Sequence, residues 1–86
     1  MRIYYSSKFA KEYKKLPKSV KIAAEKREKL FRKSPRHPSL KTHKLTGKLK
    51  SFWAFSIDYH YRIIFEFRDK DEVWFHSVGT HAIYLN

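Results

Sequence analysis

The sequence predicts a single α+β domain over residues 1–86, in which an opening strand and two helices precede a three-stranded antiparallel meander. Three observations lead to this prediction. Apolar residues recur at helical spacing early in the chain, they alternate with polar residues from Ser51 onward, and 86 residues leave room for one modest core. We expect both helices to cover one face of the sheet, because each element has to bury its apolar side.

The first part of the chain accounts for the strand and the helices. Residues 2–5 are typical of a short strand, and Ser6 or Ser7 can cap the helix that follows. Residues at helical spacing give that helix one buried stripe: Phe9, Tyr13 and Leu16. Pro17 interrupts the pattern and suits the first turn of a second helix. The inner side of that helix comprises Val20, Ala23, Ala24, Arg27, Leu30 and Phe31. Pro35 and Pro38 stop it.

The second part of the chain accounts for the meander. Residues 39–50 form a polar, lysine-rich connection, and three alternating segments follow at about 53–58, 61–68 and 73–78. The odd-numbered residues of these segments are the more apolar set, so we expect them to face the helices. The opposite, open face then carries Arg62, Trp74 and His76.

The net charge is the strongest indication of function. Twenty Lys and Arg against eight Asp and Glu give +12, an imbalance that a polyanion such as nucleic acid would relieve. The absence of cysteine excludes disulfides and thiolate metal sites, and the histidine spacing fits no zinc pattern, so we expect neither a metal nor another cofactor. The N-terminus lacks a signal peptide and no apolar run reaches membrane-spanning length, so we expect a cytoplasmic protein without a membrane partner.

A candidate catalytic site lies at one corner of the predicted sheet. The tight link 58–61 puts His60 at a hairpin tip beside Arg62, and pairing of the last two strands brings His81 and Tyr84 to the same tip. Metal-free RNA cleavage takes a proton from the ribose 2′-hydroxyl, stabilises the phosphorane and returns a proton to the 5′-oxygen. Histidine suits the proton transfers and arginine suits the phosphate, each effect contributing about 10²–10⁴-fold.

Structural roles are also open to these residues. Arg62 can pair with Glu66 or Asp58, His60 can simply be exposed, and His81 and Tyr84 can cap the chain end. His76 is expected to be a surface residue of its strand. The residues expected to bind RNA by charge or by base stacking are Lys41, Lys44, Lys48, Lys50 and Trp53, and Trp53 can instead belong to the core.

Four segments in order resemble a known family. They are Ser6–Leu16, His43–Gly47, Tyr61–Phe65 and the closing Val78–Tyr84. At this length and spacing the chain resembles the RelE/ParE superfamily of bacterial type II toxins, near its RelE/StbE and YafQ-type branches. The resemblance implies a RelE-like fold and a toxin neutralised by a cognate antitoxin. It also implies a ribosome-dependent, metal-independent endoribonuclease that cleaves mRNA by 2′-hydroxyl attack on the scissile phosphate.

The resemblance also implies roles for individual residues. Arg62 matches the strand arginine that acts on the scissile phosphate, and His81 matches the position that serves the transition state or leaving group. Tyr84 is similar in place to an aromatic residue that contacts the nucleotide. His43 falls where relatives carry a residue proposed to activate the 2′-hydroxyl, which leaves His43 and His60 as alternative general bases.

The chain also departs from the family pattern. Trp53 and Phe55 stand where RelE proper has a lysine pair, Ser56 replaces the middle histidine of YafQ-type toxins, and Ala82 replaces a common acidic residue. Two other functions remain open on the same fold. One is a ParE-type toxin that inhibits gyrase, and the other is a nucleic-acid-binding module without catalysis.

Overall fold

The elements follow the predicted order, with additions in the lysine-rich connection. The computed structural model describes the backbone of residues 1–85 and the side chains of residues 1–83. The predicted elements are β1 (Arg2–Tyr5), α1 (Ser7–Lys14), α2 (Lys18–Lys33), β3 (Trp53–Ser56), β4 (Arg62–Asp69) and β5 (Glu72–Gly79). The additions are the short strand β2 (His43–Lys44) and the 3₁₀ turns η1 (Pro38–Leu40), η2 (Gly47–Leu49) and η3 (His81–Leu85).

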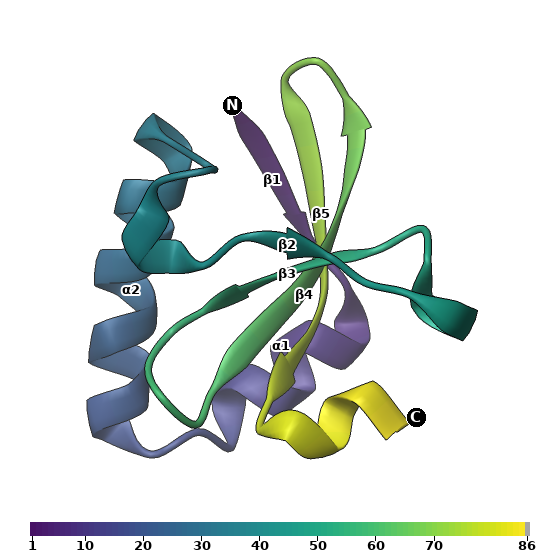
Figure 1. Ribbon diagram of the computed structural model, residues 1–86. Helices are drawn as coiled ribbons and strands as arrows, with labels where there is room; N and C mark the ends of the chain where they lie inside the picture. Colours follow the sequence, from purple (N-terminus) through teal and green to yellow (C-terminus); the bar gives the residue numbers. More distant parts are fainter. Residues whose placement is uncertain (86) are drawn as a thin grey trace.

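The sheet has five strands in the order β1-β5-β4-β3-β2 (Figure 1). The predicted antiparallel meander is confirmed as β3, β4 and β5. The opening strand β1 joins β5 in parallel, with Arg2 opposite Glu72 and Tyr5 opposite Phe75. Strand β2 extends the other edge, and its two residues are too few to produce an alternating sequence pattern.

Local sequence signals set the helix ends. The Ser6 side chain accepts a hydrogen bond from the Phe9 backbone N–H at 2.9 Å, which caps α1. Helix α1 ends at Lys14, so Leu16 lies in the link to α2 and is nevertheless buried. Pro17 caps α2 rather than opening its first turn. No helix in the described part of the chain is long and apolar enough to cross a bilayer.

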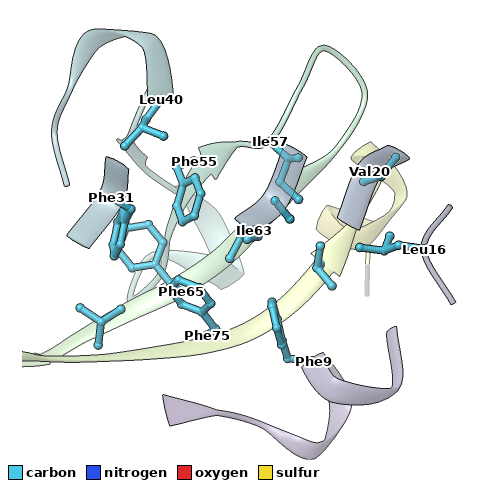
Figure 2. Close-up of a cluster of buried hydrophobic side chains, with 13 residues drawn as sticks. Phe9, Leu16, Val20, Phe31, Leu40, Phe55, Ile57, Ile63, Phe65 and Phe75 are labelled. Atoms are coloured by element: carbon cyan, nitrogen blue, oxygen red, sulfur yellow. The ribbon is translucent and has the colours of Figure 1, made fainter. Parts of the chain in front are cut away.

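Aromatic rings form the centre of the core (Figure 2). Phe31 of α2 stacks on Phe55 with ring centroids 4.7 Å apart and meets Phe65 edge-on at 4.9 Å. Phe9 of α1 packs on Phe75 of β5 at 5.5 Å. The residues that both helices bury therefore belong to one cluster with the odd-numbered residues of the meander, as the alternation predicts.

A β-bulge changes this alternation near the end of β5. Ile64 is opposite Ser77 and Phe65 is opposite Phe75, so His76 has no register partner on β4. After the bulge Val78, not Ser77, belongs to the core cluster. The strict alternation predicted for β5 is therefore wrong beyond Phe75, because an extra residue shifts which side chains face inward.

Helix α1 completes the outer edge of β5 where β1 ends. Ser6 donates its backbone N–H to the Phe75 carbonyl and its hydroxyl to the His76 carbonyl. One carboxylate oxygen of Glu12 accepts the Ser77 hydroxyl at 2.9 Å and the Val78 backbone N–H at 3.0 Å. The bonds to the backbone of β5 satisfy edge groups that lack a strand partner where β1 ends, and all of these bonds hold the segment that leads to Gly79.

Candidate functional site

Arg62 is the first residue of β4 and lies on the open face of the sheet, which is the face opposite α2. Its Cα is opposite Ser56 on β3 and Gly79 on β5. Its Nη1 donates to the carbonyls of Asp58 and Tyr59 at 2.8 and 3.1 Å, and to that of Tyr61. Arg62 forms neither of the alternative ion pairs, with Glu66 or with Asp58. Among the described residues Nε and Nη2 make no hydrogen bond, so the guanidinium is oriented on one side and open on the other.

His60 lies in the loop between β3 and β4, close to Arg62 in sequence. The Asp58 carboxylate accepts the backbone N–H groups of His60 and Tyr61 at 2.9 and 2.8 Å, which fixes the turn. The His60 ring is exposed and meets the Tyr59 ring edge-on at 5.1 Å.

The chain end returns to Arg62, as the predicted strand pairing requires. Gly79 is the register partner of Arg62, and η3 begins at His81, whose side chain is exposed. Ile83 of η3 is buried and packs against Gly79 so closely that an added Cβ would lie 2.6 Å from its Cγ2 atom. Only a glycine therefore allows η3 to fold back here. The backbone of Tyr84 belongs to η3, and its side chain lies outside the described residues.

His43 reaches the same face from β2. Its register partner is Ala54, which is opposite Ile64 of β4, so these three residues share one face. Strand spacing and rise place the His43 and Arg62 Cα atoms ~12 Å apart. The His43 Nδ1 lies 2.9 Å from the Lys41 carbonyl, which can only accept. Nδ1 therefore carries the proton, and Nε2 of the neutral ring is left as the basic nitrogen.

The predicted RNA-binding residues do not all share the face of Arg62, because Lys44 is the register partner of Trp53 and lies on the same face as Trp53. The exposed ones lie around β2 and η2, on Lys41, Lys44, Lys48 and Lys50. Trp53 instead meets Phe67 edge-on at 5.4 Å beside the core, and the Arg36 guanidinium lies over its ring at 4.6 Å. The structure thus does not bring Trp53 together with Arg62.

His76 lies on the open face, as the alternation predicts, but it also lies in a β-bulge and lines a pocket, which the alternation does not predict. It lines a pocket of about 320 Å³ together with residues of four other segments: Ser6, Lys8, Leu49, Phe52, Ile64, Ser77 and Ile83. The His76 Nε2 is 3.1 Å from the Glu66 carboxylate, which Arg68 also contacts at 3.2 Å. Alternation placed His76 on this face, but no sequence signal marked the bulge or the residues that cover it.

The pKa of Glu66 lies below its ordinary value. Burial acts to raise this pKa, but the hydrogen bonds and charges of His76 and Arg68 outweigh burial and lower it. Glu66 is therefore ionised at neutral pH and acts only as a hydrogen-bond acceptor.

A larger cavity of about 660 Å³ lies on the other side of the sheet, between α1 and α2. Its lining includes Phe9, Tyr13, Ala24 and Ile63 and is mainly apolar. The candidate catalytic residues do not line it. Within the described residues no group of three or more His, Asp or Glu side chains could hold a metal ion.

The open face carries a guanidinium and an imidazole, and the chain end brings a second imidazole back toward Arg62. Arg62 offers an oriented guanidinium, His43 offers a basic Nε2, and His81 begins the segment after Gly79. Charge-assisted bonds from an arginine fork can hold a phosphate, and imidazoles can exchange protons near neutral pH. The net charge of +12 would attract a polyanion to the protein.

Solved structures share this fold over nearly the whole chain. YafQ from E. coli strain BL21(DE3) superposes with a TM-score of 0.82 at 21% identity, covering 100% of both chains. A YoeB/ParE toxin from Agrobacterium tumefaciens gives 0.78 at 12% identity, covering 94% of this chain and 99% of that one. YafQ in the E. coli DinJ-YafQ toxin-antitoxin complex gives 0.79 at 22% identity, covering 98% and 96%.

These likenesses confirm the fold that the sequence resemblance implies: the chain has the α+β fold of the RelE-superfamily toxins YafQ and YoeB. No protein-family model and no curated protein sequence matches the chain.

Proposed function

We propose that this protein is the toxin of a type II toxin–antitoxin system and acts as a ribosome-dependent, metal-independent endoribonuclease on mRNA. The observation that carries the proposal is the setting of Arg62. Its guanidinium is oriented by three backbone carbonyls yet keeps Nε and Nη2 unbonded among the described residues, and its register partner Gly79 leads directly to His81. An oriented guanidinium binds a phosphate without first losing side-chain freedom.

The reaction proposed for this face is an internal displacement at phosphorus. The 2′-oxygen attacks the scissile phosphate, which Arg62 holds, and the bond from phosphorus to the 5′-oxygen breaks. A base takes the 2′-hydroxyl proton and an acid protonates the leaving 5′-oxygen, giving a 2′,3′-cyclic phosphate and a 5′-hydroxyl. We assign the acid to His81. We favour His43 as the base, because the Lys41 carbonyl leaves its Nε2 unprotonated in the neutral ring.

An acidic antitoxin is the second partner that we propose. A net charge of +12 destabilises a small folded domain through self-repulsion, and an acidic chain would relieve it. The fold likeness to YafQ in its complex with DinJ supports such a partner. We expect this antitoxin to cover part of the open face and to prevent binding to ribosomes.

Induced expression followed by primer extension on cellular mRNA tests the nuclease proposal. Wild-type protein should stop growth and truncate translated mRNAs, while Arg62→Ala and His81→Ala should each reduce cleavage by at least about 100-fold. Arg2→Ala is the matched control, because Arg2 is 69% exposed on β1 and its loss removes the same charge away from the site. Melting curves of the purified variants show whether each one folds.

Other outcomes would refute the proposal or its site. Growth arrest with DNA breaks and intact mRNA would indicate a gyrase inhibitor. RNA binding without cleavage on ribosomes would indicate a non-catalytic module. Full cleavage by folded Arg62→Ala and His81→Ala would remove the site assignment. Comparison of His43→Ala with His60→Ala identifies the base, and we expect the larger loss for His43→Ala.

A further inference from the structure

The β-bulge at His76 directs two consecutive side chains into one pocket. In a regular strand His76 and Ser77 would face opposite sides of the sheet. Because His76 has no partner on β4, both line the pocket on the open face, together with Ile64. Bulges that re-aim side chains are common next to functional sites.

The pocket has a volume and a lining that suit a small heterocycle. Its apolar walls come from three parts of the chain, with Leu49 and Phe52 near η2, Ile64 on β4 and Ile83 on η3. The other lining residues are polar: Ser6, Lys8, His76 and Ser77. A mainly apolar concavity with a few placed polar groups is the usual form of a small-ligand site.

The pocket adjoins the proposed phosphate-binding residue. Ile64 follows Arg62 by two residues on β4, so both face the same side at a separation of ~7 Å along the strand. Ser77 precedes Gly79 by two residues on β5, and Gly79 is the partner of Arg62. A nucleotide whose phosphate meets Arg62 therefore has its own base, or the base of its neighbour, within reach of the pocket.

The hydrogen bond to Glu66 fixes the tautomer of His76. The carboxylate only accepts, so the His76 Nε2 carries the proton and donates at 3.1 Å. In the neutral ring Nδ1 then keeps a lone pair, and it makes no hydrogen bond with any residue that the structure describes. Phe52 meets the His76 ring edge-on at 4.8 Å with planes 86° apart, which restricts the ring. His76, which lines the pocket, thus carries an oriented acceptor nitrogen.

We propose that this pocket binds a nucleobase of the RNA substrate and that His76 selects bases with an exocyclic amino group over uracil. The inference deepens the proposed function by naming what the open face recognises beside the phosphate. An amino group donates to the Nδ1 lone pair, whereas the carbonyl oxygen at the same place in uracil is repelled by it. His76 is therefore a specificity-determining residue, and Glu66 positions it.

Titration of the purified full-length protein with CMP and UMP, followed by NMR of the His76 and Phe52 ring signals, tests the proposal. The two nucleotides share ribose and phosphate and differ only at the Watson–Crick edge, where cytosine has an amino group at C4 and a bare N3, and uracil has a carbonyl at C4 and an N3–H. We expect both ring signals to shift with CMP, and CMP to bind about 2- to 10-fold more tightly than UMP, the ratio that one net hydrogen bond supplies.

Variants test whether the preference for CMP arises from the tautomer of His76 or only from packing against its ring. In Glu66→Gln the amide can donate to Nε2, which frees Nδ1 to carry the proton, so the preference for CMP should fall to parity or reverse. His76→Phe keeps an aromatic ring beside Phe52 and should bind both nucleotides equally. Glu72→Gln is the matched control, because Glu72 lies on the same face but bonds Trp74 instead, so the preference should persist.

Equal affinity for CMP and UMP in the wild-type protein, or shifts confined to residues outside the pocket, would overturn the inference. A preference unchanged in Glu66→Gln would overturn the tautomer mechanism. The measurement needs neither ribosomes nor cleavage, so it fails or succeeds independently of the nuclease assay with Arg62→Ala.

Discussion

Glu12 should contribute more to stability than any surface carboxylate of the helices, because it pairs the free edge of β5. Removing its side chain in Glu12→Ala leaves the Ser77 hydroxyl and the Val78 N–H without their acceptor. A hydrogen bond to a charged group contributes about 1.5–3 kcal/mol, and water can partly replace the carboxylate at this half-buried edge. We expect a loss of about 2–3 kcal/mol of the roughly 4–13 kcal/mol typical of a domain of this size.

Thermal unfolding followed by circular dichroism measures this loss. A change of 1 kcal/mol shifts the Tm of a small domain by about 4–8 °C, so Glu12→Ala should melt roughly 10–20 °C below wild type. Glu12→Gln keeps an acceptor oxygen and should lose about half as much. Glu25→Ala is the control, because Glu25 is an exposed helix residue. If Glu12→Ala melts within about 2 °C of Glu25→Ala, the edge-pairing argument is wrong.

Two further predictions concern the close contact at η3 and the Glu66 carboxylate. Gly79→Ala would place a Cβ 2.6 Å from the Ile83 Cγ2, so η3 has to move. We expect mRNA cleavage to fall sharply, while the free energy of unfolding falls by only about 1–3 kcal/mol. Undiminished cleavage would show that the close packing of η3 on Gly79 does not matter for activity. The folded-state pKa of Glu66 is lowered, so its stabilising contribution is present above the unfolded value of 4.5 and is lost as pH falls through the folded value. Denaturant unfolding from neutral to acidic pH should therefore show a smaller loss for Glu66→Gln than for wild type, and equal losses would show that the pairs with His76 and Arg68 add nothing.

Sequence patterns were sufficient for most of the fold. The capping serine, the two helices and the alternation around Phe55 and Phe65 are local signals. The helices and the alternation are found where they were predicted, and of the two candidate caps, Ser6 and Ser7, the structure uses Ser6. Strand β2 was not predicted, because two residues are too few to show an alternating pattern. The bulge at His76 was not predicted either, because an extra residue can be recognised only when the strand is paired with its partner.

The candidate site was predictable in its location but not in its contacts. The short turn between β4 and β5 implies that the chain end returns to the neighbourhood of Arg62, and the structure makes Gly79 the register partner of Arg62. The partners of Arg62 are backbone carbonyls rather than the Glu66 or Asp58 carboxylate that was the structural alternative. For Trp53 the sequence left base stacking and burial in the core both open. Alternation cannot tell whether an inward aromatic residue near a sheet edge stays accessible, and in the structure Trp53 packs against Phe67.

The sequence by itself determined the α+β class, the order of the elements and the strong positive charge, because these depend on composition and on periodicities that neighbouring residues carry. The tertiary structure decided which side chains share the open face. The pocket at His76, the closing of the β5 edge by Glu12 and the folding back of η3 over Gly79 all join residues that are distant in sequence. Such contacts arise from register, a bulge and close packing, which exist only between elements and not within them.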